Sequence, residues 1–296
     1  MSIHAAYLGI ILIWSTTPLA IKWSGEGPGF LFGAAARMAI GAVLCLLILR
    51  LLRMRLPWHG AAVRSYLAAT VGIYGAMVCV YWGAQYVPSG LISVLFGLTP
   101  IVTGVLAACW LKERALTPAK IAGSMIGLGG LWLIFGGEHT GAGAGLGLAA
   151  VLVSVFLHSL STVWVKRAGA GLPALTLTTG ALLFALPCYL LTWLLLDGQP
   201  PPELPRRAVL SIVYLGVFGS GAGFILYYYA LQRVTAARMA LLLLVTPVIA
   251  LLFGHLLNGE TFGAKEIAGA ALILSGLLFY ETGERWFRRP AGTEPE

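Results

Sequence analysis

One stretch of this chain occurs twice, and the repeat constrains the fold more than any other feature. Residues 81–113 read YWGAQYVPSGLISVLFGLTPIVTGVLAACWLKE, and residues 228–260 align with them without a gap as YYALQRVTAARMALLLLVTPVIALLFGHLLNGE. The residues that meet an identical residue in the second copy are Tyr81, Gln85, Val87, Leu95, Thr99, Pro100 and Glu113. A repeat of this size predicts two structurally related halves.

The composition decides where such a chain can fold. Hydrophobic residues make up 59% of it and charged residues only 10%, whereas soluble domains carry about 25% charged residues. We therefore predict an integral membrane protein. A membrane helix needs about 20 apolar residues, and the runs that qualify lie at 3–23, 29–52, 64–85, 89–111, 118–136, 144–166, 173–196, 208–231, 236–257 and 263–281. The first run lacks a basic region and a cleavage motif, so we expect it to be retained rather than removed as a signal peptide.

Positive charges predict the orientation of the spans. The excess of 19 Lys and Arg over 11 Asp and Glu could suggest a nucleic-acid partner. The basic residues lie in short loops instead, as membrane topology requires, so no nucleic acid is expected. With cytoplasmic termini, the outer segments hold only Lys22, Arg206, Arg207 and Lys265, and Arg37 lies within a span. The positive-inside rule therefore predicts that both termini are cytoplasmic.

The predicted fold is all-α, with ten transmembrane helices arranged as two five-helix repeats. Five is an odd number, so the second repeat should enter the membrane inverted relative to the first. We expect the first repeat to cover residues 1–139, the second to cover 140–283, and a polar cytoplasmic tail to cover 284–296. Inverted halves can rock about a site near the middle of the membrane, which predicts transport.

These features resemble the EamA type of the drug/metabolite transporter superfamily, and the chain is similar to the bacterial amino-acid exporters of that group. A Thr-Pro pair lies midway along spans four and nine, a Glu ends each of these spans, and the next helix opens with Ile-Ala-Gly. The residues concerned are Thr99, Pro100, Glu113, Thr246, Pro247 and Glu260, followed by 121–123 and 267–269. The resemblance implies a multi-pass protein of the bacterial inner membrane, with a central cavity lined mainly by spans one to four and six to nine.

A helical projection predicts the side chains that face this cavity. In span three, Thr70, Tyr74, Met77, Tyr81 and Gln85 share one face, and the opposite face carries Gly72, Gly75, Cys79 and Gly83, which suit close helix contact. The candidate substrate-binding residues are Trp14, Thr17, Tyr74, Met77, Tyr81, Gln85, Ser93, Phe96, His158, Ser161, Phe224, Tyr228 and Gln232. Pro100 and Pro247 are candidate gating points, because proline removes a backbone hydrogen bond and kinks a helix.

Two polar groups within the spans admit more than one interpretation, because such groups are costly in hydrocarbon unless they find a partner or water. His158 could bind substrate, carry a proton, or form a hydrogen bond with a neighbouring helix. Arg37 could be a structural cation held by backbone carbonyls or by Glu26, or it could anchor a substrate carboxylate. Glu113 and Glu260 are expected to fix the turns beside them rather than bind ions.

The leading functional interpretation is a secondary transporter that exports small metabolites, above all amino acids, by alternating access around the central cavity. Neither a cofactor nor a metal is expected; the partners are a small-molecule substrate and the lipid bilayer. One alternative is efflux of drug-like organic cations, although no acid lies well inside a span. A membrane-embedded enzyme is the other, although the sequence has no HExxH, GxSxG or P-loop motif. Facilitated export and proton exchange both stay open.

Overall fold

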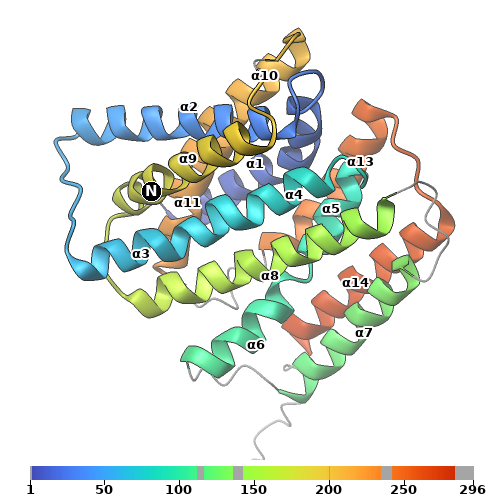
Figure 1. The fold of residues 1–296 in the computed structure, drawn as a ribbon. Helices are drawn as coiled ribbons and strands as arrows, with labels where there is room; N and C mark the ends of the chain where they lie inside the picture. The colour runs from blue at the N-terminus through green and yellow to red at the C-terminus, as the bar shows by residue number, and fades with distance from the viewer. Residues whose placement is uncertain (1, 112–116, 136–142, 200, 235–241, 284–296) are drawn as a thin grey trace, which may run out of the picture.

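The computed structural model describes residues 2–111, 117–135, 143–199, 201–234 and 242–283, and every regular element in these ranges is a helix (Figure 1). The elements are α1 (Ile3–Ser24), α2 (Phe30–Leu51), α3 (Gly60–Thr70), η1 (Val71–Ala76), α4 (Met77–Gly83), α5 (Ser89–Phe96), α6 (Thr99–Leu111), α7 (Pro118–Phe135), α8 (Ala144–Ala168), α9 (Ala174–Leu196), α10 (Arg206–Tyr214), η2 (Leu215–Ala222), α11 (Gly223–Leu231), α13 (Leu242–Asn258) and α14 (Ala264–Thr282). The prediction of an all-helical fold is confirmed.

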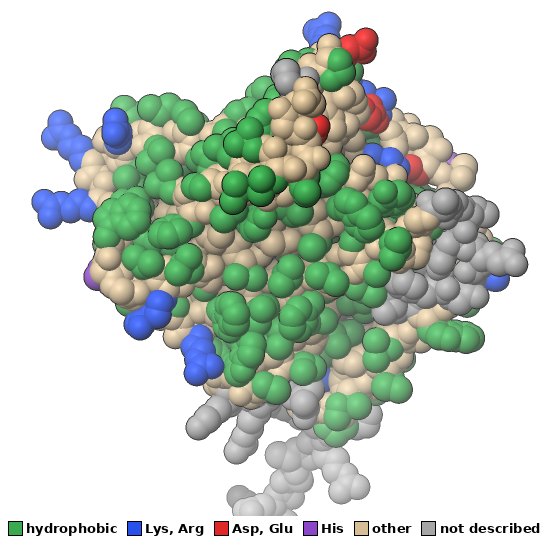
Figure 2. All heavy atoms as spheres, in the orientation of Figure 1, with side chains coloured by type: hydrophobic (Ala, Val, Ile, Leu, Met, Phe, Trp, Pro, Cys, Tyr) green, Lys and Arg blue, Asp and Glu red, His purple; other side chains and the backbone are tan. Residues whose placement is uncertain are grey.

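Within the described residues, seven segments are long and apolar enough to cross a membrane by length and composition. They are Ile3–Ser24, Phe30–Leu51, Gly60–Gly83, Ser89–Leu111, Ala144–Ala168, Ala174–Leu196 and Arg206–Leu231. Helices α7, α13 and α14 lie in the other predicted spans, whose crossing of the membrane stays a prediction. Apolar side chains spread over the face in Figure 2, and charged ones gather at its margins, as expected for a protein surrounded by lipid.

Predicted spans three and eight are not uniform α-helices. Each contains a π-helical segment, η1 between α3 and α4 and η2 between α10 and α11. A π-helical turn holds more residues than the 3.6 of an α-helix, so side chains on either side of it no longer share one straight stripe. A helical projection at 3.6 residues per turn therefore does not predict which side chains share a face along the whole span.

Predicted span four is two helices rather than one helix kinked at a proline. Helix α5 ends at Phe96, two turn residues follow, and α6 begins at Thr99. Pro100 lies in the first turn of α6 rather than in the middle of a helix as expected, so its missing N–H removes no helical hydrogen bond. Pro247, in contrast, lies inside α13 as predicted.

Helices α7 and α14 pack side by side at the edge of the molecule (Figure 1). Glycines let their backbones approach closely. A Cβ atom added at Gly123 would lie 2.5 Å from the carbonyl oxygen of Gly276, and one added at Gly130 would lie 2.5 Å from that of Gly269. Small residues allow such contact between membrane helices.

Candidate functional site

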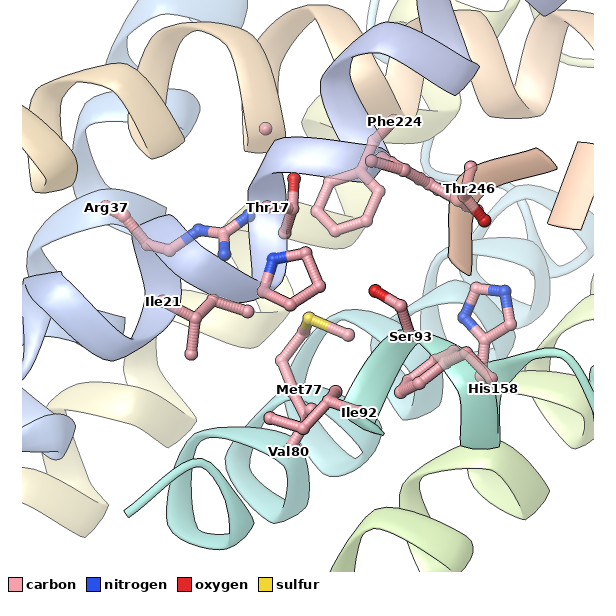
Figure 3. Close-up of a pocket in the computed structure, with 14 residues that line it drawn as sticks. Thr17, Ile21, Arg37, Met77, Val80, Ile92, Ser93, His158, Phe224 and Thr246 are labelled. Carbon is pink, nitrogen blue, oxygen red and sulfur yellow. The ribbon is translucent and has the colours of Figure 1, made fainter. Parts of the chain in front are cut away.

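A cavity of about 70 Å³ lies between helices that are far apart in the sequence (Figure 3). Its walls come from α1, α2, α4, α5, α8, η2, α11 and α13, so segments distant in sequence meet there. The lining residues are Trp14, Thr17, Pro18, Ile21, Arg37, Met77, Val80, Ile92, Ser93, Phe96, His158, Gly219, Phe224 and Thr246. Among the described residues, no carboxylate lines the cavity, and neither α7 nor α14 contributes a residue.

One wall of the cavity is aromatic and centres on the His158 ring. This ring lies 5.9 Å from Trp14, 6.1 Å from Phe96 and 5.4 Å from Tyr227, measured between ring centroids. The side chain of His158 is 8% exposed and has no hydrogen-bond partner in the described part of the chain. The interpretation that it bonds to a neighbouring helix therefore finds no support, and its nitrogens stay available to a solute.

Many of the predicted site residues meet at this cavity. Those that line it are Trp14, Thr17, Met77, Ser93, Phe96, His158 and Phe224. Tyr81 and Tyr228 are buried close by: the hydroxyl of Tyr81 accepts a hydrogen bond from Arg37 at 3.4 Å, and the ring of Tyr228 lies 6.5 Å from that of Phe224. The hydroxyl of Ser161 donates to the carbonyl of Ala68 at 2.8 Å, so it ties α8 to α3.

Other predicted residues lie away from the cavity. The Tyr74 hydroxyl is 2.6 Å from Thr192 Oγ1, and Tyr74 belongs to a separate groove between α3, η1 and α8. Gln85 and Gln232 are exposed, just after α4 and α11, and donate to the backbone carbonyls of Trp82 and Leu172. Thus Met77 is the residue of the predicted stripe that lines the cavity.

Several lining residues escaped the sequence-based prediction. The repeat could have indicated Thr246, because this residue aligns with Thr99 in the first copy. Arg37 was considered as an anchor for a substrate carboxylate, because it is a charge well inside a span, but it was not among the candidate substrate-binding residues. Gly219 lies in η2, and the sequence did not indicate the π-helical geometry of this segment. The proposal that Glu26 holds Arg37 is wrong, since Glu26 is exposed and pairs with Arg207 at 3.7 Å.

A polar network joins the end of α1 and the turn after α13 to the start of α5. Glu260 is its centre: it accepts hydrogen bonds from the backbone N–H groups of Ser89 at 2.9 Å and Gly90 at 3.2 Å, and its carboxylate lies 3.6 Å from Lys22 Nζ. These N–H groups begin α5 and have no partner within the helix. Glu260 therefore anchors α5 as well as its own turn. Glu113, its partner in the repeat, lies outside the described residues.

The protonation of Glu260 is set by opposing effects. Burial alone would raise the pKa of its carboxyl, but the hydrogen bonds from Ser89 and Gly90 and the charge of Lys22 outweigh burial, so the pKa lies below its ordinary value. A lowered pKa means that the ionised carboxylate stabilises the folded protein. This stabilisation is complete above the ordinary pKa of a glutamate, and it is lost as the pH falls through the lowered value.

We expect Glu260→Gln to lower the free energy of unfolding by about 1.5–3 kcal/mol, the range for hydrogen bonds to a charged group. The thermal unfolding temperature in detergent measures this change, and the acid-dependent part of the stability should diminish with it. Glu26→Gln is the matched control, because an exposed ion pair contributes about 0–1 kcal/mol. Equal shifts in the two variants would contradict the anchoring role of Glu260.

Comparison with known proteins identifies the family. The model of the EamA-like transporter family matches residues 1–136 and 145–282. This chain belongs to the EamA-like transporter family. It is therefore a multi-pass membrane transporter rather than an enzyme, and the resemblance noted in the sequence is confirmed.

Individual relatives of this EamA-like chain are also named as transporters. It is 30% identical over 278 residues to the uncharacterized transporter YoaV of Bacillus subtilis, covering 92% of this chain and 94% of that protein. It is 27% identical over 288 residues to a probable terminal-alkyne amino-acid exporter of Streptantibioticus cattleyicolor, covering 96% and 94%. A solved crystal structure matches with a TM-score of 0.70 at 22% identity, over 97% of this chain and 99% of the other, which shows a shared fold.

Proposed function

We propose that this EamA-like protein exports small amino-acid-like metabolites by alternating access around the central cavity. The observation that carries the proposal is the lining itself, in which aromatic rings and neutral hydroxyls from distant segments enclose one space. Such a lining suits a compact zwitterion, since apolar surface contacts the side chain and an aromatic face attracts an ammonium group. The relative named as a probable amino-acid exporter supports the same substrate class.

The proposal also includes the topology of the protein in the membrane. Ten spans as two inverted five-helix repeats, with both termini in the cytoplasm of a bacterial cell and the protein in its inner membrane, would let the halves rock about the cavity. Support comes from the duplicated segment, from η1 and η2 in corresponding spans, and from the basic residues of the predicted cytoplasmic loops. The two EamA segments at 1–136 and 145–282 fit the proposed halves.

The size of the cavity requires movement. A pocket that buries a drug-sized ligand measures about 300–1,000 Å³, whereas this cavity has about 70 Å³. A transport cycle must therefore widen it on one side at a time. The break between α5 and α6 beside Pro100 and the proline inside α13 at Pro247 are the places where we propose that the helices bend.

The lining argues against export of organic cations. A site for such solutes needs a negative group to compensate the charge that leaves water. In the part of the chain that the structure describes, no carboxylate lines the cavity, and the buried carboxylate of Glu260 is held by Ser89, Gly90 and Lys22 instead. Amino-acid-like solutes are therefore the better fit.

A radiolabelled uptake panel with purified protein in lipid vesicles tests the proposal, and the wild type should transport several neutral amino acids. Trp14→Ala should reduce uptake of all of them about tenfold, the equivalent of about 1.4 kcal/mol of lost contact, because this ring forms part of the aromatic wall. Trp132→Ala is the matched control, since Trp132 is 74% exposed on α7 and should leave uptake unchanged.

Two results would count against this proposal. If the wild type moves no amino acid in vesicles, the substrate class is wrong. If Trp14→Ala and Trp132→Ala transport every amino acid equally well, the solute does not pass the aromatic wall.

A further inference from the structure

We propose that Arg37 is the anion-binding residue of the cavity, and that the cavity takes solutes with a single carboxylate attached to an apolar body. This inference rests on the proposed function, because it concerns the same cavity, and it names the group by which that cavity would recognise a substrate.

The first observation is the burial of an uncompensated charge. The Arg37 side chain is 1% exposed, and its partners are neutral: Nε donates to Ser220 Oγ at 3.0 Å and Nη1 to the Tyr81 hydroxyl at 3.4 Å. The ion pairs within the described residues join Lys22 to Glu260 and Arg207 to Glu26, so neither involves Arg37. A buried cation is costly unless an opposite charge pairs with it.

The second observation is which part of the guanidinium stays free. A guanidinium has about five N–H donors in a fixed fork, and Ser220 and Tyr81 use one on Nε and one on Nη1. Among the described residues, Nη2 has no acceptor. A Cβ atom at Gly219 would lie 2.9 Å from Nη2, so only a glycine at this position of η2 lets the guanidinium lie where it does. The edge formed by Nη1 and Nη2 is the one that binds a carboxylate through two parallel hydrogen bonds.

The third observation is the position of this edge in the cavity. Arg37 and Gly219 both line the space, and Figure 3 shows the guanidinium pointing inward beside Thr17, with the Ser93 hydroxyl and the His158 ring on the far side. The cavity is thus polarised, with a cation at one end and aromatic rings at the other. A small carboxylate with an apolar body matches both ends.

The charge comes from one half of the chain only. Helix α9 begins at Ala174 as α2 begins at Phe30, and the position of α9 that corresponds to Arg37 holds Ala181. Ala181 is fully buried and lines no part of the cavity. A structural requirement common to both halves therefore does not explain the arginine, whereas one anion per cavity does.

Ligand-induced thermal stabilisation of the purified protein tests the proposal with three probes: L-phenylalanine, 3-phenylpropanoate, which lacks the amine, and 2-phenylethylamine, which lacks the carboxylate. The two carboxylates should stabilise the wild type and the amine should not. Arg37→Gln should bind both carboxylates about 10- to 100-fold more weakly, the equivalent of about 1.4–2.8 kcal/mol. Arg50→Gln, the same change at an exposed position of α2, should bind them as the wild type does.

The outcomes separate this proposal from the proposed function. If 3-phenylpropanoate binds and needs Arg37 while no amino acid is bound or transported, the anion site stands and amino-acid export fails. If L-phenylalanine is transported and Arg37→Gln binds it as tightly as the wild type, export stands and the anion site is overturned. Wild-type protein that binds none of the probes, or binds the amine as well as the carboxylates, also overturns the anion site.

A second variant covers the case in which Arg37→Gln does not fold. Arg37→Lys keeps the charge but loses the two-pronged edge. It should bind 3-phenylpropanoate more weakly than the wild type, and Arg50→Lys should not. Equal affinity for 3-phenylpropanoate in the wild type and Arg37→Lys would overturn recognition through the guanidinium edge.

Discussion

Replacing Ser93 by leucine is expected to abolish transport while leaving the protein folded. Ser93 is 4% exposed on α5, and its hydroxyl points into the cavity (Figure 3). The leucine side chain would occupy much of a cavity of about 70 Å³. Because it fills existing space rather than overpacking the helices, the thermal unfolding temperature should stay the same or rise. Uptake into lipid vesicles and thermal unfolding in detergent measure the two effects on the same preparation.

The matched control is Ser275→Leu, which makes the same change at an exposed position of α14 that lines no part of the cavity. This variant should transport at the wild-type rate. If Ser93→Leu also transports at that rate, solutes cross the protein by a route that avoids the cavity. If it lowers the unfolding temperature by several degrees, the loss of uptake reflects damage to the fold instead of a blocked cavity.

The helical class and the positions of most spans could be predicted because each depends on local composition. A run of about 20 apolar residues forms a helix in a membrane whatever its neighbours are, since the backbone groups must bond within the segment. The π-helical segments η1 and η2 and the break after Phe96 could not be predicted, because packing against other helices decides them. The Thr99-Pro100 pair marked the right place but suggested a kink rather than two helices.

The residues of the candidate site also differ in whether the local sequence or the packing of helices decides their position. Trp14, Ser93, Phe96 and His158 were predicted from polar or aromatic character within a span, and they meet at one cavity. Tyr74 was placed on the same face by a projection at 3.6 residues per turn, but η1 turns it toward Thr192. The hydrogen bond from Arg37 to Ser220 depends on η2, a segment distant in the sequence, which no local pattern reveals.

Replacing Gly123 by leucine is expected to have the largest effect on folding. A Cβ atom at this position would lie 2.5 Å from the Gly276 carbonyl oxygen and 2.5 Å from the Tyr280 backbone nitrogen. Backbone atoms cannot rotate away as a side chain can, so α7 and α14 would have to separate. Overpacking a well-packed contact costs about 1–3 kcal/mol and sometimes more, and a rigid backbone contact belongs to the upper end. Little monodisperse protein should survive size-exclusion chromatography after extraction.

Gly129→Leu is the control on the same helix, because nothing lies within 4 Å of a Cβ atom at Gly129. This variant should extract and unfold like the wild type, since its side chain would extend into lipid. Gly276→Leu should reproduce the defect from the opposite side, because its Cβ atom would lie 2.6 Å from the Gly123 carbonyl oxygen. If Gly123→Leu and Gly129→Leu behave alike, the close backbone contact between α7 and α14 does not hold these helices together. If only Gly123→Leu and Gly276→Leu fail, the glycine contact is required for folding although neither helix lines the cavity.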